Sequence, residues 1–327
     1  MNATEKIIDF ITGHNLDDTP SEALEKTRAS IMDYTGVTLA GTSEQASMIV
    51  RKTVREMGGT PQAGVWGSNL KTAANLAALA NGTAAHALDY DDTNQVMLAH
   101  PSIQLLPALL ALGEHRHAKG EDIMVAYVIG YEVGARVGRT VNPYVVLGGW
   151  FPVGPLGTMM QTAACARLMG LDQDQIRMAI GIAASLASGL RCNSGTMAKP
   201  LVAGTSASNA ILAVSLAAEG MTATPAVLEE HFGFLQNFGC KEKDTLTKEV
   251  ESLGESFEIL ETGMSYKRHP CCAGSHSSID CTLDILSSHE INPDEIEEVK
   301  VAVSSGVKFL LIHSCPETVA EAKFSLE

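Results

Sequence analysis

The densest group of side chains that could move a proton lies in a short segment after an alanine-rich stretch. Three carboxylates stand there within four residues, followed by a hydroxyl and an imidazole; the group is Asp89, Asp91, Asp92, Thr93 and His100. Carboxylates this close repel one another unless they cap a helix, bind a cation or face a ligand. Histidine is the side chain whose ordinary pKa lies nearest to neutral pH. The group therefore predicts a site of acid–base chemistry, against the alternative of a solvated turn at a helix end.

Two known motifs share part of this pattern, and both fit poorly. Asp89-Tyr-Asp-Asp-Thr93 matches D-x-D-x-T, the nucleophile loop of phosphotransferases of the haloacid dehalogenase type, which must follow a buried β-strand. Residues 75–88 are helix formers with hardly a β-branched side chain, so that loop is disfavoured. A calcium-binding EF-hand is disfavoured as well, because Asn94 and His100 stand where its loop needs glycine and glutamate.

A second group surrounds a lone cation. Lys199 is the only lysine or arginine between Arg191 and Lys241, and it lies in a Gly/Ser/Thr segment between two apolar stretches. A loop that joins buried helices can bring such a cation to a substrate carboxylate, helped by backbone donors and by the hydroxyl of Thr196. Lys199 and Thr196 are therefore candidate substrate-binding residues, and a solvated surface lysine is the alternative.

A third group concentrates positive charge in an otherwise acidic chain. Lys267-Arg-His-Pro-Cys-Cys272 contains two adjacent cations, and His276 follows on the next predicted helix. These residues are candidates for substrate binding, with an exposed basic strand end as the alternative. The glycine-rich segment 148–157 could form a wall around a ligand, but it lacks the G-x-x-x-x-G-K pattern of a phosphate loop, so nucleotide binding is not indicated.

The composition disfavours several classes of protein. The 327 residues carry 23 Lys and Arg against 38 Asp and Glu, a net charge of −15, which repels nucleic acid and anionic membrane surfaces. The longest charge-free stretch, 140–166, is interrupted by prolines and glycines and predicts a loop rather than a membrane span. Seven scattered cysteines without a C-x-x-C pair fit a reducing cytoplasm and predict no metal cluster. The N-terminus also lacks a signal-peptide core, so we expect a cytoplasmic protein. We expect no metal or other cofactor.

The elements that must position these groups are mostly helices. Up to about residue 235, apolar residues recur at three- and four-residue intervals, which predicts helices over 22–41, 72–88, 103–117, 121–138, 157–169, 173–189 and 203–219. The chain is then charged over 241–256, and strand-like alternation at 257–261 and 299–303 flanks a predicted helix at 275–289. We therefore predict a mainly α fold, with a large all-helical domain at 1–260 and the beginning of a smaller α+β lid domain at 261–327.

Taken together, these segments resemble the MmgE/PrpD family, which includes 2-methylcitrate dehydratase, cis-aconitate decarboxylase and iminodisuccinate epimerase. The most specific stretch runs from Asn75 to Thr93 and continues in His100-Pro-Ser102. Two further motifs support it, Ser194-Gly-Thr-Met-Ala-Lys199-Pro and Lys267-Arg-His-Pro-Cys-Cys272…His276. The similarity extends over the whole chain.

The resemblance implies a metal-free site between the helical domain and the lid, usually in a homodimer. Carried over residue by residue, it places three segments in the active site: Asp89, Thr93 and His100 in the first, Lys199 in the second, and Lys267 with Cys272 in the third. We expect His100 to transfer the proton, Asp89 and Thr93 to orient His100 and the substrate, and the two lysines to bind carboxylates.

The family's chemistry is proton transfer next to a carboxylate of a small di- or tricarboxylate. A cofactor-independent lyase most like 2-methylcitrate dehydratase is our first expectation, with an epimerase of the iminodisuccinate type or a cis-aconitate decarboxylase as alternatives. Many relatives have Gly-Phe-His-Pro-Thr-Gly where this chain has Gly149-Trp-Phe151-Pro-Val153-Gly154, so two polar groups that would contact substrate are missing. A catalytically silent polycarboxylate-binding protein is therefore a second class that stays open.

The resemblance also bears on the extent of the chain. Relatives continue beyond the motif that corresponds to Ala322-Lys-Phe-Ser-Leu326. We therefore expect the chain to be a C-terminally truncated family member that is inactive by itself.

Overall fold

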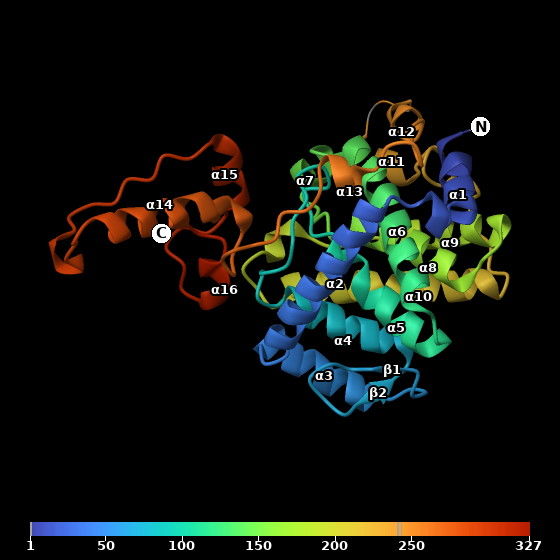
Figure 1. Ribbon diagram of the computed structural model, residues 1–327, viewed down its shortest axis with the longest axis horizontal. Coiled ribbons are helices and arrows are strands. Elements are labelled where there is room, and N and C mark those ends of the chain that lie inside the picture. Colours follow the sequence, from blue (N-terminus) through green and yellow to red (C-terminus); the bar gives the residue numbers. More distant parts are fainter. Residues whose placement is uncertain (1, 241, 243) are drawn as a thin grey trace.

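The computed structural model describes residues 2–240, 242 and 244–327, so Lys241 and Lys243 of the charged segment lie outside the described residues. Figure 1 shows a large helical body and, to one side of it, a smaller part that carries the last three helices. The described helices are α1 (Ala3–Gly13), α2 (Ser21–Gly41), α3 (Gln45–Met57), α4 (Ala74–His86), α5 (Leu106–Arg116), α6 (Gly120–Val141), α7 (Tyr144–Leu147), α8 (Pro155–Met169), α9 (Gln173–Leu186), α10 (Ala198–Ala218), α11 (Phe234–Asn237), α12 (Thr245–Glu249), α13 (Glu258–Glu261), α14 (His276–Ser288), α15 (Ser305–Leu310) and α16 (Val319–Ala322).

Strand structure is minor in the described part of the chain. Two short antiparallel strands, β1 (Ala63–Gly64) and β2 (Lys71–Thr72), form a hairpin between α3 and α4. The prediction of a mainly α fold is therefore confirmed.

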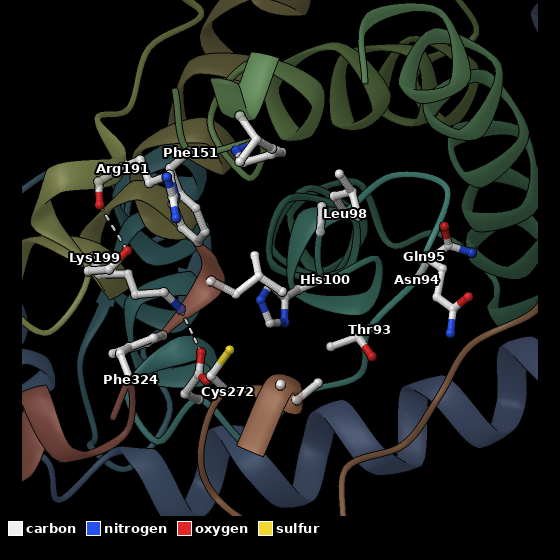
Figure 2. Close-up of a pocket in the computed structure, with 18 residues that line it drawn as sticks. Thr93, Asn94, Gln95, Leu98, His100, Phe151, Arg191, Lys199, Cys272 and Phe324 are labelled. Atoms are coloured by element: carbon white, nitrogen blue, oxygen red, sulfur yellow. Dashed lines mark hydrogen bonds and ion pairs between the residues drawn. The ribbon is translucent and has the colours of Figure 1, made fainter. Parts of the chain in front are cut away.

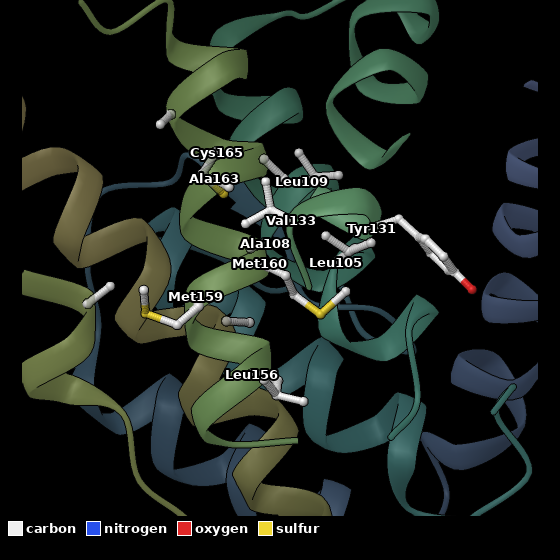
Figure 3. Packing of buried hydrophobic residues seen from close by; sticks show 14 of the residues in the cluster. Leu105, Ala108, Leu109, Tyr131, Val133, Leu156, Met159, Met160, Ala163 and Cys165 are labelled. Atoms are coloured by element: carbon white, nitrogen blue, oxygen red, sulfur yellow. The ribbon is translucent and has the colours of Figure 1, made fainter. Parts of the chain in front are cut away.

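The helical body is built around α10, which packs against α4, α8 and α9, while α6 packs against α8. Figure 3 shows part of the core, to which three segments contribute Leu105, Tyr131 and Met160. All three are fully buried, which stabilises the fold through the removal of apolar surface from water. Of the described helices, α10 alone is long and apolar enough to span a membrane by length and composition, and half of that stretch is covered by its neighbours, as in a core helix.

Glycines set the separation of α4 and α10. A β-carbon on Gly204 would lie 2.1 Å from the carbonyl oxygen of Leu79, and one on Gly82 would lie 2.9 Å from the α-carbon of Gly204. The two helices run antiparallel, because Lys199 near the start of α10 meets His86 at the end of α4. The close approach at the glycines therefore brings the charged end of α10 to the polar end of α4.

Most predicted helices are present with shifted ends, and α3 is an additional helix that the periodicity did not indicate. The prediction that 140–166 is largely a loop is wrong: its prolines lie between and at the starts of helices, with Pro143 preceding α7 and Pro155 beginning α8.

Both predicted strands are absent. Residues 258–261 form helix α13, and Glu258 is as buried as the apolar residues beside it because two arginines pair with it. The alternation of apolar and polar residues at 257–261 therefore did not indicate a strand with one buried and one exposed face. Residues 299–303 have no regular structure, and Val299, Val301 and Val303 are exposed. A strand needs a neighbouring strand to pair its backbone groups, and no described strand lies beside this segment.

The smaller part, which we call the side unit (residues 273–327), contacts the helical body through hydrogen bonds that involve Cys272, His313 and Lys323. The backbone N–H of Cys272 donates to the carbonyl of Lys323 at 2.9 Å. The ammonium of Lys323 donates to the carbonyl of Ala87 at 3.0 Å, and Nε2 of His313 lies 2.7 Å from the carbonyl oxygen of Ser194. These contacts place the side unit over the junction of α4 and α10.

Candidate active site

A cavity of about 200 Å³ lies at this junction and holds many of the groups that the sequence singles out (Figure 2). Its walls come from the loop after α4, the glycine-rich loop, the start of α10 and the side unit. The polar lining residues are Asp89, Thr93, Asn94, Gln95, His100, Arg191, Ser194, Lys199 and Cys272, and the apolar ones are Leu98, Ala99, Val146, Phe151, Pro152, Ala273, Gly274, Leu310 and Phe324.

Asp89 lies at the centre of the charged groups. It follows the end of α4 in a left-handed backbone conformation, with φ of 53°, which aspartate tolerates better than most residues. Its carboxylate accepts from Nζ of Lys199 at 2.5 Å and from Nζ of Lys267 at 3.1 Å, and Lys267 also donates to the Asp89 carbonyl at 2.6 Å. All three side chains are buried. One carboxylate thus joins two cations that are 68 residues apart in the chain.

The charges of Asp89, Lys199 and Lys267 determine one another's protonation states. Burial alone raises the pKa of Asp89, but the ammonium groups of Lys199 and Lys267 outweigh it and hold the pKa well below its usual range. Burial lowers the pKa of Lys267, and the carboxylates of Asp89 and Asp91 more than reverse that, so the net pKa is raised. Asp89 is therefore ionised, and it serves to hold the lysines rather than to carry a proton.

Asp91 binds two histidines at once. One carboxylate oxygen lies 2.9 Å from Nδ1 of His86, and the other lies 2.9 Å from Nδ1 of His100. Nδ1 of His100 is also 3.0 Å from the carbonyl oxygen of Asp92. Because every partner of these two nitrogens is an acceptor, both rings carry a proton on Nδ1. Asp91 orients His100, and the prediction that Asp89 does so is wrong.

The free nitrogen of His100 faces the cavity. With Nδ1 engaged, Nε2 has no hydrogen-bond partner among the described residues, and the ring lines the cavity wall. Figure 2 shows the imidazole near the middle of the view, between Thr93 on one side and Lys199 on the other. This is the position of a group that gives a proton to a bound molecule or takes one from it.

His86 is held in its neutral form. Its Nε2 lies 2.7 Å from Nζ of Lys199, so it accepts from the ammonium while Nδ1 donates to Asp91. Burial lowers its pKa to about 4, partly offset by Asp91 and reinforced by Lys199. The ring stacks on Phe151, with 5.8 Å between ring centroids and an interplanar angle of 18°. His86 thus links the lysine to the histidine pair without carrying charge.

Asp92 faces away from the cavity into the core. Its carboxylate accepts from the backbone N–H of Ser102 at 3.0 Å and from the Ser102 hydroxyl at 2.6 Å. Burial raises its pKa to about 7, which the bonds from Ser102 only partly counter. The three neighbouring aspartates therefore have three different environments.

A backbone bridge attaches the loop after α4 to the segment that carries Lys267. Thr93 and Ser265 exchange two backbone hydrogen bonds of 2.9 Å. The amide of Asn94 donates to the carbonyl of Gly263 at 2.7 Å and to the hydroxyl of Tyr131 at 2.8 Å. Because Lys267 follows Ser265 by two residues, this bridge delivers its ammonium beside Asp89.

A buried ion-pair network holds α13, the helix that precedes Ser265, against α6. Glu132 on α6 accepts from the first backbone N–H groups of α13, at Glu258 and Ile259. Burial raises the pKa of Glu132 to about 7, against these bonds and Arg136. Arg136 and Arg139 pair with Glu258 at 3.1 and 2.8 Å. The network fixes the position from which the chain runs to Ser265.

The predicted site residues do not all reach the cavity. Thr93 and Cys272 line it, and burial raises the pKa of the Cys272 thiol. Thr196 faces a neighbouring hollow and accepts from the N–H of Ala198 at the start of α10. His276 begins α14 with its ring against His269, and Nε2 is buried without a hydrogen-bond partner. Lys267 does not line the cavity; it binds the side chain and the carbonyl of Asp89, which does.

Four residues that form this site had no role predicted from the sequence. Asp91 was part of the densest group, and His86 precedes it by five residues across a helix end, which was the available signal. Arg191 and Phe151 line the cavity, and they come from segments already noted for a cation and for glycines. Val153, the second apolar replacement in the glycine-rich loop, is fully buried and does not line the cavity.

One group of donors has the spacing of a metal site, namely His86, Asp89 and His100. A metal ion does not fit among these donors, because Lys199 already binds two of them. Nζ of Lys199 lies 2.7 Å from Nε2 of His86 and 2.5 Å from the Asp89 carboxylate, between two atoms that are 4.0 Å apart. The ammonium therefore occupies the place a metal ion would take, and a second positive charge there would be repelled.

Comparison with known proteins gives two matching families of domains. Residues 5–247 match the MmgE/PrpD N-terminal domain, and residues 269–327 match the MmgE/PrpD C-terminal domain. The matches together cover most of the chain, including every residue that lines the cavity.

Curated relatives are similar over nearly the whole chain. It is 27% identical over 293 residues to the cis-aconitate decarboxylase-like protein oryM of Aspergillus oryzae, covering 85% of this chain and 60% of that protein. It is 28% identical to the cis-aconitate decarboxylase of Homo sapiens, covering 86% and 59%, and 28% identical to that of Aspergillus terreus, covering 92% and 65%. The chain thus spans about 60% of the length of the first of these relatives.

Proposed function

The chain belongs to the MmgE/PrpD family, and from this premise we propose that it forms the active site of a cofactor-independent lyase that decarboxylates a small unsaturated polycarboxylate. The observation that carries the proposal is the arrangement around His100. Its imidazole is anchored through Nδ1 to Asp91, presents Nε2 to a small cavity, and stands near the ammonium of Lys199 and the guanidinium of Arg191. A proton donor beside groups that bind carboxylates is what such a reaction requires.

The reaction needs one proton for each molecule of substrate. The carbon–carbon bond to the departing carboxylate breaks, carbon dioxide leaves, and the electron pair shifts onto the carbon skeleton. The imidazolium of His100 then gives its Nε2 proton to the carbon that receives the pair, and the ring regains a proton from water. Asp91 stabilises the imidazolium throughout, because its carboxylate stays bonded to Nδ1.

The cations act on the carboxylates that remain. Lys199 spends two N–H groups on His86 and Asp89, which leaves a third for the cavity that its side chain lines. Asp89 and His86 thereby fix the direction of the ammonium before substrate arrives. Prearranged donors of this kind stabilise developing charge without reorganisation during the reaction.

The relatives support decarboxylation over our first expectation of a 2-methylcitrate dehydratase, since the curated matches are named cis-aconitate decarboxylases. Decarboxylation also requires one proton-transfer group, and His100 presents one free imidazole nitrogen. Dehydration needs both a base and an acid for the leaving hydroxide, and epimerisation commonly needs groups on two faces of the carbon.

The experiment is proton NMR of the protein in D₂O with cis-aconitate, 2-methylcitrate, citrate and iminodisuccinate in turn. We expect an unsaturated acid to lose carbon dioxide and to gain one carbon-bound deuterium. His100→Asn should lower the rate by about a hundred- to ten-thousand-fold and leave affinity within a few-fold. The matched control is His289→Asn, at an exposed histidine directly after the end of α14.

The same spectra discriminate among the alternatives. Loss of water from 2-methylcitrate would support the dehydratase, and deuterium uptake without bond cleavage would support an epimerase. Saturable binding with neither change would support the catalytically silent binding protein.

A further inference from the structure

We infer that Arg191 binds a second carboxylate that the substrate keeps when carbon dioxide leaves, and that it thereby makes the site selective for acids with two carboxylates to be held. This role rests on the proposed function, in which Lys199 binds one of the remaining carboxylates. Three features of Arg191 support it, namely the lack of a carboxylate partner among the described residues, the free donors of its guanidinium, and the backbone hydrogen bonds that fix it beside the cavity.

Arg191 is the one cation of the cavity lining that has no opposite charge beside it in the described part of the chain. Lys199 binds the carboxylate of Asp89, and His100, when protonated, has the carboxylate of Asp91 at Nδ1. Burial lowers the pKa of Arg191, and a neighbouring thiol rather than a carboxylate counters this effect. Because arginine stays protonated in proteins, its charge is compensated only when an anion enters the cavity.

The hydrogen-bond donors of Arg191 are mostly available. Among the described contacts, one of the five N–H groups of its guanidinium is used, for the carbonyl oxygen of Phe309. The guanidinium carbon lies 3.8 Å from the centroid of the Phe309 ring, which covers one face of the group. Leu310, the next residue, lines the cavity, so this contact places the guanidinium at the cavity wall. The donors lie in the plane of the guanidinium, so stacking leaves them free to bind a carboxylate through two parallel hydrogen bonds.

Backbone pairing fixes Arg191 beside the glycine-rich loop. Its N–H donates to the carbonyl of Gly149 at 2.9 Å, and the N–H of Phe151 donates to the carbonyl of Gly189 at 3.0 Å. Figure 2 shows Arg191 next to Phe151 at the edge of the cavity. The loop has only aromatic and aliphatic side chains over 150–153, so Arg191 supplies the positive charge next to it.

The two cations divide the carboxylates of the substrate between them. One carboxylate leaves as carbon dioxide, one binds the free N–H group of Lys199, and one binds Arg191. An acid with a single carboxylate to be held leaves one cation without an anion. Because a hydrogen bond between charged groups commonly changes affinity by about ten- to a hundredfold, we expect the site to favour acids that keep two carboxylates.

The experiment measures the binding of three unreactive acids with one carbon skeleton by NMR titration. Methylsuccinate has two carboxylates, and 2-methylbutyrate and 3-methylbutyrate each have one of these replaced by a methyl group. We expect the wild-type protein to bind methylsuccinate more tightly than either monocarboxylate, by about tenfold or more. Arg191→Gln should weaken the binding of methylsuccinate by about ten- to a hundredfold and that of each monocarboxylate by about threefold at most, because Lys199 can still bind a single carboxylate.

Two further variants separate the charge of Arg191 from its structural contacts. Arg191→Lys keeps the positive charge and should bind methylsuccinate several-fold more tightly than Arg191→Gln. Arg51→Gln is the matched control, since Arg51 on α3 donates to the carbonyl of Thr42 and does not line the cavity. It should leave the affinities for all three acids unchanged.

The outcomes distinguish this role from the proposed function. Unchanged binding of methylsuccinate by Arg191→Gln would show that the guanidinium does not touch the ligand, and equal weakening of all three acids would show that Arg191 only holds the side unit through Phe309. Either result overturns the role of Arg191 and leaves the proposed function standing, whereas failure of the wild-type protein to bind methylsuccinate contradicts both. If Arg191→Gln does not fold, equal affinities of the wild-type protein for the three acids still overturn the role.

Discussion

At the scale of single residues, Asp91 shows how one carboxylate can set the chemistry of two rings. It accepts from Nδ1 of both His86 and His100, so each ring has its proton on the nitrogen away from its functional partner. His86 can then accept from Lys199, and His100 can present Nε2 to the cavity. The tautomers of His86 and His100 are thus coupled, because both rings donate to the same carboxylate.

Replacing Asp91 by asparagine is expected to break this coupling. The amide offers one acceptor oxygen and one NH₂ donor, so one of the two rings must move its proton to Nε2. We expect kcat to fall by about a hundredfold or more and KM to change only a few-fold, since substrate contacts stay in place.

The control is Asp92→Asn, whose side chain contacts Ser102 and no histidine. Its kcat and pH–rate profile should follow the wild type, whereas Asp91→Asn should change the shape of the profile. Equal losses in both variants would mean that Asp91 has a general structural role.

Asp92 has a separate consequence for stability. Its pKa is raised from 3.8 to about 7 by burial, with Asp91 and Asp33 adding to the effect. Between pH 4 and pH 7 the unfolded chain ionises this carboxyl while the folded protein keeps it protonated, so this group's contribution to stability falls as the pH rises. The two pKa values differ enough to cost up to about 4 kcal/mol at pH 7 and above.

Asp92→Asn should therefore gain stability relative to the wild type as the pH rises through this window. Denaturant unfolding at pH 4.5, 6 and 7.5 measures the difference. His86 contributes in the opposite direction, because its lowered pKa costs stability as the pH falls from 6.5 toward 4, but it is present in both proteins and cancels. A difference that does not change with pH would show that Asp92 is ionised in the folded state.

At the scale of elements, the site depends on how closely α4 and α10 approach. The two glycines Gly82 and Gly204 face each other at the crossing, and Lys199 and His86 lie about one helical turn farther along. Any side chain at the crossing separates the helices and with them the lysine from its two partners.

Gly204→Ala is expected to destabilise the protein by about 3 kcal/mol, since its β-carbon would lie 2.1 Å from the Leu79 carbonyl oxygen. Gly36→Ala on α2 is the control, because a β-carbon there meets nothing within 4 Å and alanine favours a helix by about 1 kcal/mol. Thermal melting should show opposite shifts for the two variants, and ligand affinity should fall only in Gly204→Ala. Similar melting temperatures would mean that the crossing has room to relax.

The elements also show what the sequence could predict. Helices with regular apolar spacing, such as α2 and α6, were predicted to within a few residues, because periodicity records burial directly. The segment at 257–261 was mistaken for a strand because Glu258 is buried with Arg136 and Arg139, partners more than a hundred residues away. A local pattern cannot reveal a partner at that distance.

The site was predictable as a group of residues and not as a set of contacts. Asp89, His100, Lys199 and Lys267 were singled out by residue type and resemblance, and the structure brings them together. The left-handed turn at Asp89 directs the neighbouring side chains to different sides. It therefore decides which aspartate binds the lysines and which binds the histidines. That turn has no strong signal in residue types, so the pairing of Asp91 with two histidines was missed.

At the scale of the whole molecule, the cavity is completed by two parts that touch at few points. The side unit supplies Leu310 and Phe324 to the lining, and its contacts with the helical body include the bond of His313 to the Ser194 carbonyl. Arg191 also donates to the carbonyl of Phe309 and lies over its ring. Because few contacts hold this part, its opening should cost less free energy than unfolding of the core.

His313→Ala is expected to loosen the side unit without disturbing the helical body. Loss of one hydrogen bond of about 1 kcal/mol raises the open population roughly fivefold. Hydrogen exchange measured by mass spectrometry should then quicken in residues 305–325 and stay unchanged in α6 and α10. Affinity for cis-aconitate should fall by a similar factor, because Leu310 and Phe324 leave the ligand when the side unit opens. His289→Ala, on an exposed part of the same unit, should change neither quantity. Faster exchange without loss of affinity would show that the ligand is held by the helical body alone.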